Sequence, residues 1–241
     1  MTKYLYEIQV NTLSPKPGII IWYAKIPEII RSIFRKGTYH NSRQMVNEIF
    51  QKHDFIFPVF SSREIQQING FKTLKKQMEW ISGRFLIKNL IQDAFFNDMT
   101  LDQISFSYLD KGAPVSANDP DIPVSLSHSH DYAAVAVCMD KNQSIGIDVE
   151  HIGPKPDTWF MKTAFTQAET AAMPDNARDI FRHWTIKEAF LKYIRQGFNE
   201  SLHRVEVING QIWHCSERIN MDISSYDIDD SYIISIVSRA I

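Results

Sequence analysis

The fold of this 241-residue chain is constrained most strongly by two long segments in which apolar residues recur at helical spacing. Strand-like segments flank each of them. The first covers residues 61–96 and opens with a serine of the kind that caps helices. It predicts one long helix, or two helices broken at Asn69 and Gly70. The second covers residues 177–197, and we expect its final residue, Gly197, to end the helix.

The other apolar segments have the composition of β-strands. Before the first helix we expect strands at residues 4–10 and 18–26. After it, residues 123–139 (PVSLSHSHDYAAVAVCM) and 144–152 (SIGIDVEHI) are predicted to be two strands of a hairpin that turns at the polar residues 140–143.

Three more strands are expected to close the chain, two within residues 203–215 around an Asn-Gly turn and one within residues 231–240. The order is then strands, long helix, strands, helix and strands, which is an α+β pattern rather than the strict alternation of a doubly wound sheet. Because this pattern is roughly repeated, we divide the chain into an N-terminal half, residues 1–142, and a C-terminal half, residues 143–241.

Composition limits the class of protein. With 44% hydrophobic and 22% charged residues the chain can bury a core, and its net charge of -2 argues against a dedicated nucleic-acid binder. Cys138 and Cys215 are too few for a disulfide framework or a cysteine-based zinc site, so a reducing cytoplasm is the simplest location. No segment has the pattern of a signal peptide or a spanning helix, and we expect neither secretion nor membrane insertion.

Two carboxylates lie two positions apart in the stretch IGIDVEH, residues 145–151. On a strand, Asp148 and Glu150 would project from one face, with Ile147 and Val149 on the other. Paired carboxylates suit Mg²⁺, which completes its shell with water and substrate phosphate. Solvated acids on an exposed strand are the commoner meaning of such a pair.

Glu188 and Lys192 lie four residues apart on one face of the second predicted helix, whereas Lys187 lies off that face. A surface ion pair is one interpretation. The other is a third carboxylate that shares a metal with Asp148 and Glu150, beside a lysine that reaches phosphate oxygens.

In the stretch SLSHSH, residues 125–130, Ser127 and His128 lie at the end of a short apolar segment. Histidine can donate a hydrogen bond to phosphate. The alternatives are a partly buried strand histidine, or an H-x-H metal pair with His130. A zinc site would need a third nitrogen or sulfur ligand, for which His151 is a candidate.

Taken in order, SLSHS, GIDVE and WTIKEAFLKY resemble the signature motifs of 4'-phosphopantetheinyl transferases of the surfactin-synthetase-activating type. The resemblance runs over about residues 112–207 and more loosely over 61–90, and it does not cover residues 24–60. It implies transfer of the phosphopantetheine arm of coenzyme A to a serine of an apo acyl or peptidyl carrier protein. Adenosine 3',5'-bisphosphate would be released, and Mg²⁺ would be required.

The resemblance also implies a fold and a set of site residues. The fold would be two similar halves, each an antiparallel sheet with a long helix, related by a pseudo-twofold axis within one chain, with the site between them. The implied residues are Asp148, Glu150 and Glu188 as metal ligands, Glu188 also as acceptor of the serine proton, Lys192 as a phosphate contact, and Ser127 and His128 as coenzyme A contacts, His128 to the 3'-phosphate.

The chain departs from the family pattern at three places. Glu79 stands where arginine is common, so a contact to coenzyme A phosphate is missing or replaced. Candidate replacements are Lys72, Lys75 and Lys76. The family's Gly-Lys-Pro turn is Gly-Ala-Pro at residues 112–114, with Lys111 in front of it, and His151 follows the acidic pair where a basic residue is common.

Two other functions fit parts of the pattern. One is a non-catalytic homologue that binds coenzyme A or a carrier protein. The other is a metal-dependent phosphohydrolase that uses His128, His130, Asp148 and Glu150. For a transferase, residues 165–181 are the expected carrier-docking segment by position, unless their apolar side chains Phe165, Met173 and Ile180 belong to the core.

Overall fold

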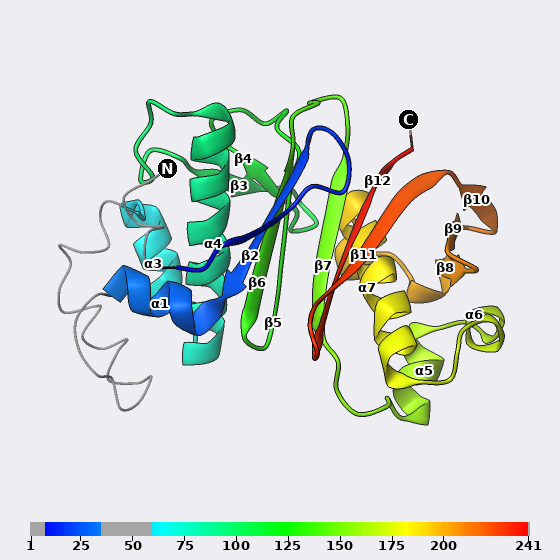
Figure 1. The fold of residues 1–241 in the computed structure, drawn as a ribbon. Coiled ribbons are helices and arrows are strands. Elements are labelled where there is room, and N and C mark those ends of the chain that lie inside the picture. The colour runs from blue at the N-terminus through cyan, green and yellow to red at the C-terminus, as the bar shows by residue number, and fades with distance from the viewer. Residues whose placement is uncertain (1–7, 35–58, 241) are drawn as a thin grey trace.

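The computed structural model describes residues 8–34 and 59–240, in which helices pack against antiparallel sheets (Figure 1). All strand pairs in these residues are antiparallel. The predicted α+β class is therefore confirmed. None of the described helices is long and apolar enough to cross a membrane.

The first sheet has four strands in the order β1-β2-β6-β5. Its strands are β1 (Asn11–Leu13), β2 (Ile19–Lys25), β5 (Val124–Ser129) and β6 (Tyr132–Cys138). The single strand predicted for residues 123–139 is wrong, because the chain turns back at His130, whose φ is 49°. The strand predicted at residues 4–10 lies partly outside the described residues, and residues 8–10 form no strand.

Helix α4 (Leu74–Phe95) covers one face of this sheet, and α1 (Ile26–Phe34) and α3 (Ser62–Gly70) pack against α4 (Figure 1). Ser61 caps α3, since its hydroxyl accepts the Glu64 amide while the Glu64 carboxylate accepts the Ser61 amide. α3 ends at Gly70 and Thr73 caps α4, so of the two predicted alternatives the broken helix is correct.

The second sheet has the order β11-β12-β7. Its strands are β7 (Ile145–His151), β11 (Met221–Asp229) and β12 (Tyr232–Arg239). The hairpin predicted between residues 123–139 and 144–152 is wrong, because β6 pairs with β2 and β5 while β7 pairs with β12. The two sheets instead pack face to face, with Ala134 and Ala136 of β6 in one apolar cluster with Ile147 of β7.

The second major helix, α7 (Ala177–Tyr193), covers the far side of the second sheet, so that α4 and α7 enclose both sheets (Figure 1). α7 ends before Gly197. The Arg195 amide donates to the Lys192 carbonyl and the Gln196 amide to the Leu191 carbonyl, which forms a Schellman motif with Arg195 at φ 56°. Gly197 begins a short 3-10 helix, η2 (Gly197–Asn199).

Smaller elements complete the C-terminal part. They are α5 (Thr158–Ala164), α6 (Gln167–Ala172), η3 (Leu202–Arg204), and the sheet of β8 (Val205–Ile208), β9 (Gln211–His214) and β10 (Glu217–Ile219). The Asn-Gly turn is confirmed, with both Asn209 and Gly210 at positive φ between β8 and β9. Five strands, not three, follow α7 in the described residues, because residues 217–229 add β10 and β11.

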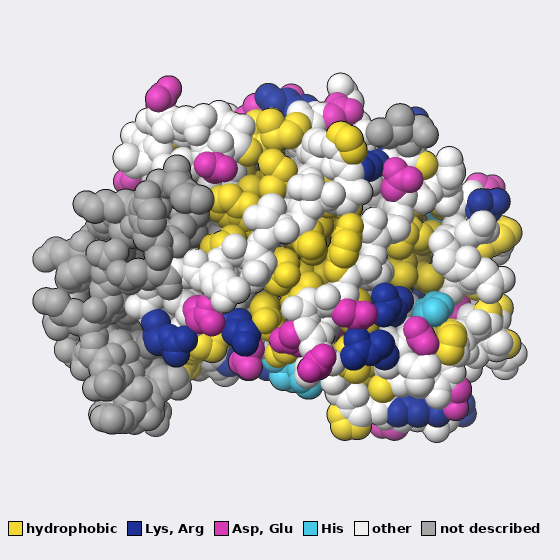
Figure 2. All heavy atoms as spheres, in the orientation of Figure 1, with side chains coloured by type: hydrophobic (Ala, Val, Ile, Leu, Met, Phe, Trp, Pro, Cys, Tyr) yellow, Lys and Arg dark blue, Asp and Glu magenta, His cyan; other side chains and the backbone are white. Residues whose placement is uncertain are grey.

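Hydrophobic and charged side chains occupy different parts of the surface (Figure 2). In the view of Figure 2, hydrophobic side chains gather over the middle of the molecule, and charged side chains of both signs lie along its lower edge. In the C-terminal part, Phe165, Met173 and Ile180 form a buried cluster, so the apolar residues of the expected docking segment are core.

Candidate active site

Alternate serines of β5 join the edges of the two sheets. β5 and β7 are edge strands, and no backbone ladder connects them. Instead the Ser125 hydroxyl accepts the Ile147 amide at 3.0 Å, and the Ser129 hydroxyl accepts the His151 amide at 3.3 Å. The S-x-S-x-S spacing thus places three hydroxyls on one strand face against β7.

The middle serine, Ser127, belongs to a cluster with an acid and a lysine. Its hydroxyl donates to Asp148 Oδ1 at 2.7 Å, while the Lys192 ammonium lies 2.8 Å from Ser127 Oγ and 2.7 Å from Asp148 Oδ1. Asp148 is only 4% exposed. The structure therefore brings residues from β5, β7 and α7 into direct contact.

Gly146 allows α7 to approach β7 so closely. A β-carbon at this position would lie 1.9 Å from the Ala189 carbonyl oxygen and 2.4 Å from the Tyr193 amide nitrogen. Because no side chain intervenes, the α7 face that carries Glu188 and Lys192 packs directly on the strand that carries Asp148.

Glu150 projects from the same face of β7 as Asp148, as predicted. It accepts the Ser129 hydroxyl at 2.7 Å and the indole N–H of Trp184 at 3.4 Å. Burial, and then the nearby Asp148 charge, raise the pKa of Glu150 to about 7. A positive charge placed nearby would therefore stabilise the ionised form of Glu150.

Glu188 is buried beside the same group. Burial first, and then repulsion by Asp148, raise the pKa of Glu188 to about 8. Glu188 Oε1 and Asp148 Oδ2 are both buried without a hydrogen-bond partner. Buried acceptors normally have a partner, so these two oxygens indicate a site for a cation or for a hydrogen-bond donor that no side chain supplies.

These three carboxylates fit a hard cation such as Mg²⁺ in chemistry, because they offer oxygen atoms and the charge of Asp148 raises the pKa of Glu150 and of Glu188. Asp148 and Glu188 also each leave one buried acceptor without a partner. They do not form a closed ligand set. Among the residues that the structure describes, no three His, Cys, Asp or Glu side chains are grouped closely enough to hold a metal. An incomplete set of protein ligands can still bind Mg²⁺, because water and substrate oxygens complete the coordination shell of this ion.

His128 points toward α4 rather than toward the carboxylates. Its Nδ1 lies 3.6 Å from Glu79 Oε2, and burial lowers the pKa of His128. Lys75 and Lys76 lie 3.9 and 4.0 Å from the same Glu79 carboxylate. Two of the three candidate replacements, Lys75 and Lys76, thus lie beside Glu79, and all three lysines are exposed.

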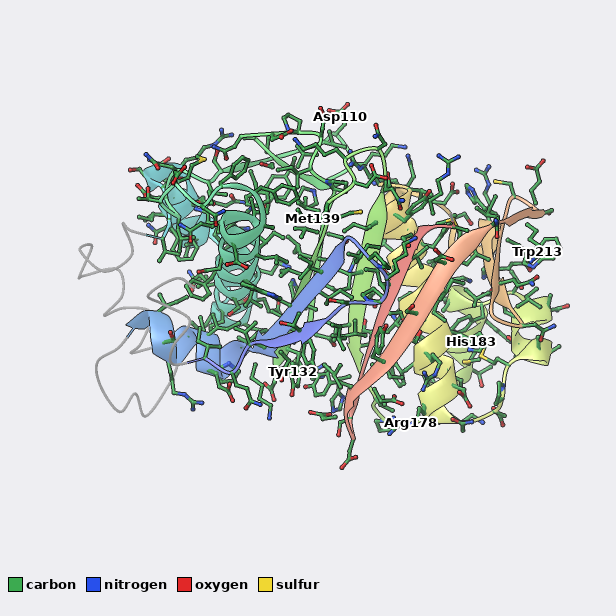
Figure 3. All side chains as sticks on the ribbon, turned by 45° about the horizontal axis from the view of Figure 1, so that its top comes forward. Asp110, Tyr132, Met139, Arg178, His183 and Trp213 are labelled. Atoms are coloured by element: carbon green, nitrogen blue, oxygen red, sulfur yellow. The ribbon has the colours of Figure 1, made fainter. Side chains whose placement is uncertain are left out.

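His130 and His151 lie together at the turn between β5 and β6. Their rings are 4.6 Å apart between centroids, and the His151 ring also contacts Tyr232. Among the residues that the structure describes, His128, His130 and His151 do not form a group that could hold a metal ion. Figure 3 shows Tyr132, which follows this turn, far from Asp110 on the opposite edge of that view.

A pocket of 280 Å³ adjoins the cluster between α7 and the loop that joins β3 (Phe106–Tyr108) to β4 (Pro114–Ser116). Asp110, labelled in Figure 3, marks this loop. The charged residues in the wall are Lys111, Glu188, Lys192 and Arg195. Apolar side chains also line the pocket, among them Tyr108 and Phe198, which are both exposed. The pocket can hold an anionic group beside an apolar one.

Sequence reasoning missed two polar partners in this cluster. Ser129 lies two residues after Ser127, and Trp184 lies one helical turn before Glu188; both hydrogen-bond Glu150. Strand and helix spacing was the available signal for each. The place of Arg195 in the pocket wall had no such signal, because it depends on where α7 ends.

Residues 144–237 match the family model of the 4'-phosphopantetheinyl transferase superfamily. The match covers β7, α7 and the strands that follow. The resemblance predicted from the motifs is therefore confirmed.

Several curated proteins are similar to this chain. The 4'-phosphopantetheinyl transferase of Bacillus subtilis is 26% identical over 197 residues, which cover 77% of this chain and 84% of that protein. The 4'-phosphopantetheinyl transferase HetI of Nostoc is 28% identical over 156 residues, 61% of this chain and 64% of that protein. The mouse L-aminoadipate-semialdehyde dehydrogenase-phosphopantetheinyl transferase is 28% identical over 160 residues, 59% of this chain and only 50% of its own length.

Proposed function

We propose that this relative of the 4'-phosphopantetheinyl transferases transfers the 4'-phosphopantetheine group of coenzyme A to a serine of an apo acyl or peptidyl carrier protein. Adenosine 3',5'-bisphosphate is the second product. The observation that carries the proposal is the group formed by Asp148, Glu188 and Lys192. It presents two unpartnered carboxylate oxygens and one ammonium next to a pocket lined by cations.

The chemistry requires a base and a way to balance the charge on the pyrophosphate. The carrier serine oxygen attacks the β-phosphorus, the bond from that phosphorus to the bridging oxygen breaks, and its electron pair leaves on the α-phosphate. Glu188 accepts the serine proton, directly or through a water. Without a cation, burial and Asp148 raise the pKa of Glu188 to about 8, so the carboxyl holds a proton at neutral pH. A bound cation would favour the ionised carboxylate, which can then accept the serine proton.

Asp148, Glu150 and Glu188 would hold Mg²⁺. When bound, the ion neutralises charge on the pyrophosphate oxygens as the bond breaks. Lys192 would contact the phosphates from the α7 side, and Ser127 and His128 would hold the coenzyme A side. For His128, a 3'-phosphate contact requires that the neighbouring Glu79 charge stay compensated by Lys75 and Lys76.

The two units, each a sheet backed by a long helix, are inferred to be halves related by a pseudo-twofold axis, divided near residues 142 and 143. The site then lies between them, and one chain suffices as a pseudo-dimeric monomer. The docking segment for the carrier is proposed at residues 165–181 through their exposed polar residues, since the apolar ones are buried.

The test is the dependence of product release on the acceptor. Wild-type protein, coenzyme A and Mg²⁺ should release adenosine 3',5'-bisphosphate only when an apo carrier protein is added, as measured by chromatography. Release of phosphate or nucleotide without a carrier would instead support the phosphohydrolase alternative. No release with several carriers would overturn the transferase proposal.

A further inference from the structure

Arg195 has a backbone conformation that ordinarily selects glycine. It occupies the left-handed position of the Schellman motif at the end of α7, with φ 56°. A residue with a β-carbon is strained there, whereas glycine is not. A strained residue next to a candidate site points to a role for its side chain.

The side chain of Arg195 lines the 280 Å³ pocket beside Glu188 and Lys192. It is also in the wall of a neighbouring polar pocket of 510 Å³ that contains Lys141. Among the residues that the structure describes, no side chain or carbonyl forms a hydrogen bond or ion pair with its guanidinium. Five donors are thus available to a ligand.

The other cations of the 280 Å³ pocket already have partners. Lys111 donates to the side-chain oxygen of Gln196, and Lys192 donates to Asp148 and Ser127. Ala113, where the family pattern has lysine, lies in the same wall and brings no charge. On the Ala113 side the wall therefore has only Lys111, which is bound to Gln196, whereas Arg195 is the cation of the wall without a partner among the described residues.

We propose that Arg195 binds a phosphate group of coenzyme A and replaces the cation that is absent at Ala113. The inference rests on the proposed function for its ligand. A guanidinium can bind a phosphate through two parallel hydrogen bonds, which an ammonium cannot do. Arg195 contributes to donor affinity and does not take part in proton transfer, which is assigned to Glu188.

The experiment compares Arg195→Gly, Arg195→Ala and Arg195→Lys with the control Arg218→Ala. Arg218 is an exposed arginine on β10 that forms no described ion pair and lies outside the pocket wall. Coenzyme A affinity is measured by calorimetry with Mg²⁺ present, and stability by thermal melts. The glycine and alanine variants should weaken coenzyme A binding by about tenfold or more, and lysine should restore part of it.

Stability separates a binding role from a structural one. Arg195→Gly should raise the melting temperature by about 2–4 °C, because the strain is removed, while coenzyme A binding becomes weaker. In turnover, KM for coenzyme A should rise while kcat and KM for the carrier change little. Equal coenzyme A affinity in Arg195→Ala and Arg218→Ala would overturn the inference, whatever the melts show.

Two arms identify the phosphate and separate this inference from the transferase proposal. If Arg195→Ala loses affinity for coenzyme A but not for 3'-dephospho-coenzyme A, the contact is to the 3'-phosphate; if it loses affinity for both, the contact is to the pyrophosphate. A wild type that binds coenzyme A through Arg195 but modifies no carrier would refute the transferase and leave this contact supported. A wild type that does not bind coenzyme A at all would overturn both.

Discussion

Gly146 of β7 lies so close to Ala189 of α7 that a β-carbon on the glycine would be 1.9 Å from the alanine carbonyl oxygen. This contact sets the distance between the strand that carries Asp148 and the helix that carries Glu188. The site geometry therefore depends on a position with no functional group of its own.

Gly146→Ala should destabilise the protein. The added methyl meets backbone atoms, which cannot rotate away, so α7 must shift at a cost of about 1–3 kcal/mol or more. The melting temperature should fall by about 2–4 °C for each kcal/mol. The control is Gly70→Ala, where an added β-carbon would meet no atom within 4 Å, and which should melt at or above the wild-type temperature. Equal melts for both variants would contradict the packing described.

The raised pKa of Glu188 predicts how stability depends on pH without metal. The folded protein holds this proton up to about pH 8, whereas an ordinary glutamate loses it near pH 4.5. The folded state therefore binds more protons in this window, and the free energy of unfolding should fall as pH rises from about 4.5 to 8. Denaturant titrations in EDTA measure the slope.

Glu188→Gln should flatten that slope, leaving the smaller part that comes from Glu150. Glu217→Gln, which changes an exposed carboxylate on β10, is the matched control and should keep it. A wild-type slope of the opposite sign would mean that Glu188 is ionised without difficulty in the metal-free site.

Mg²⁺ should stabilise the protein, and most strongly near pH 8, where the carboxylates repel one another. A ligand that binds only the folded state adds about 2.7 kcal/mol at a hundred times its dissociation constant. Thermal melts with Mg²⁺, against NaCl at equal ionic strength, should show the shift for wild type and lose it for Asp148→Asn. No shift with or without coenzyme A would count against the cation site.

Lys187, next to Glu188, has a structural role in the fold. Its ammonium is fully buried and lies 2.7 Å from Glu169, which in turn accepts the Val207 amide. Lys187→Met would leave a buried carboxylate without its partner, and should cost about 3–5 kcal/mol in denaturant titrations. Lys155→Met, which breaks only an exposed pair with Asp175, should change stability little. Similar losses in both variants would show that burial does not decide the effect.

Sequence patterns predicted the elements whose ends carry local signals. The serine cap of α3, the Asn-Gly turn of β8 and β9, and the body of α7 are confirmed for this reason. The β5–β6 turn was missed because it uses His130 at positive φ instead of glycine. β6 is buried on both faces, so its apolar run had no alternation to place its ends.

The partners of each strand could not be predicted from neighbouring segments. The polar residues 140–143 do form a turn region, but β6 and β7 leave it for different sheets. For the site, the faces that carry Asp148, Glu150, Ser129 and Trp184 follow from strand and helix spacing, whereas the contacts of Ser129 and Trp184 with Glu150 depend on which elements meet. The place of Arg195 depends on where α7 ends. Spacing predicts what lies on one element, and tertiary packing decides the rest.

The most direct test of the account is the intact mass of an apo carrier protein after incubation with coenzyme A and Mg²⁺. With wild-type protein the carrier should gain the mass of one phosphopantetheine group, on its serine. Glu188→Gln should fail although the variant folds, and Glu217→Gln should modify the carrier as wild type does. An unchanged carrier mass with wild type, or full modification by Glu188→Gln, would contradict the account.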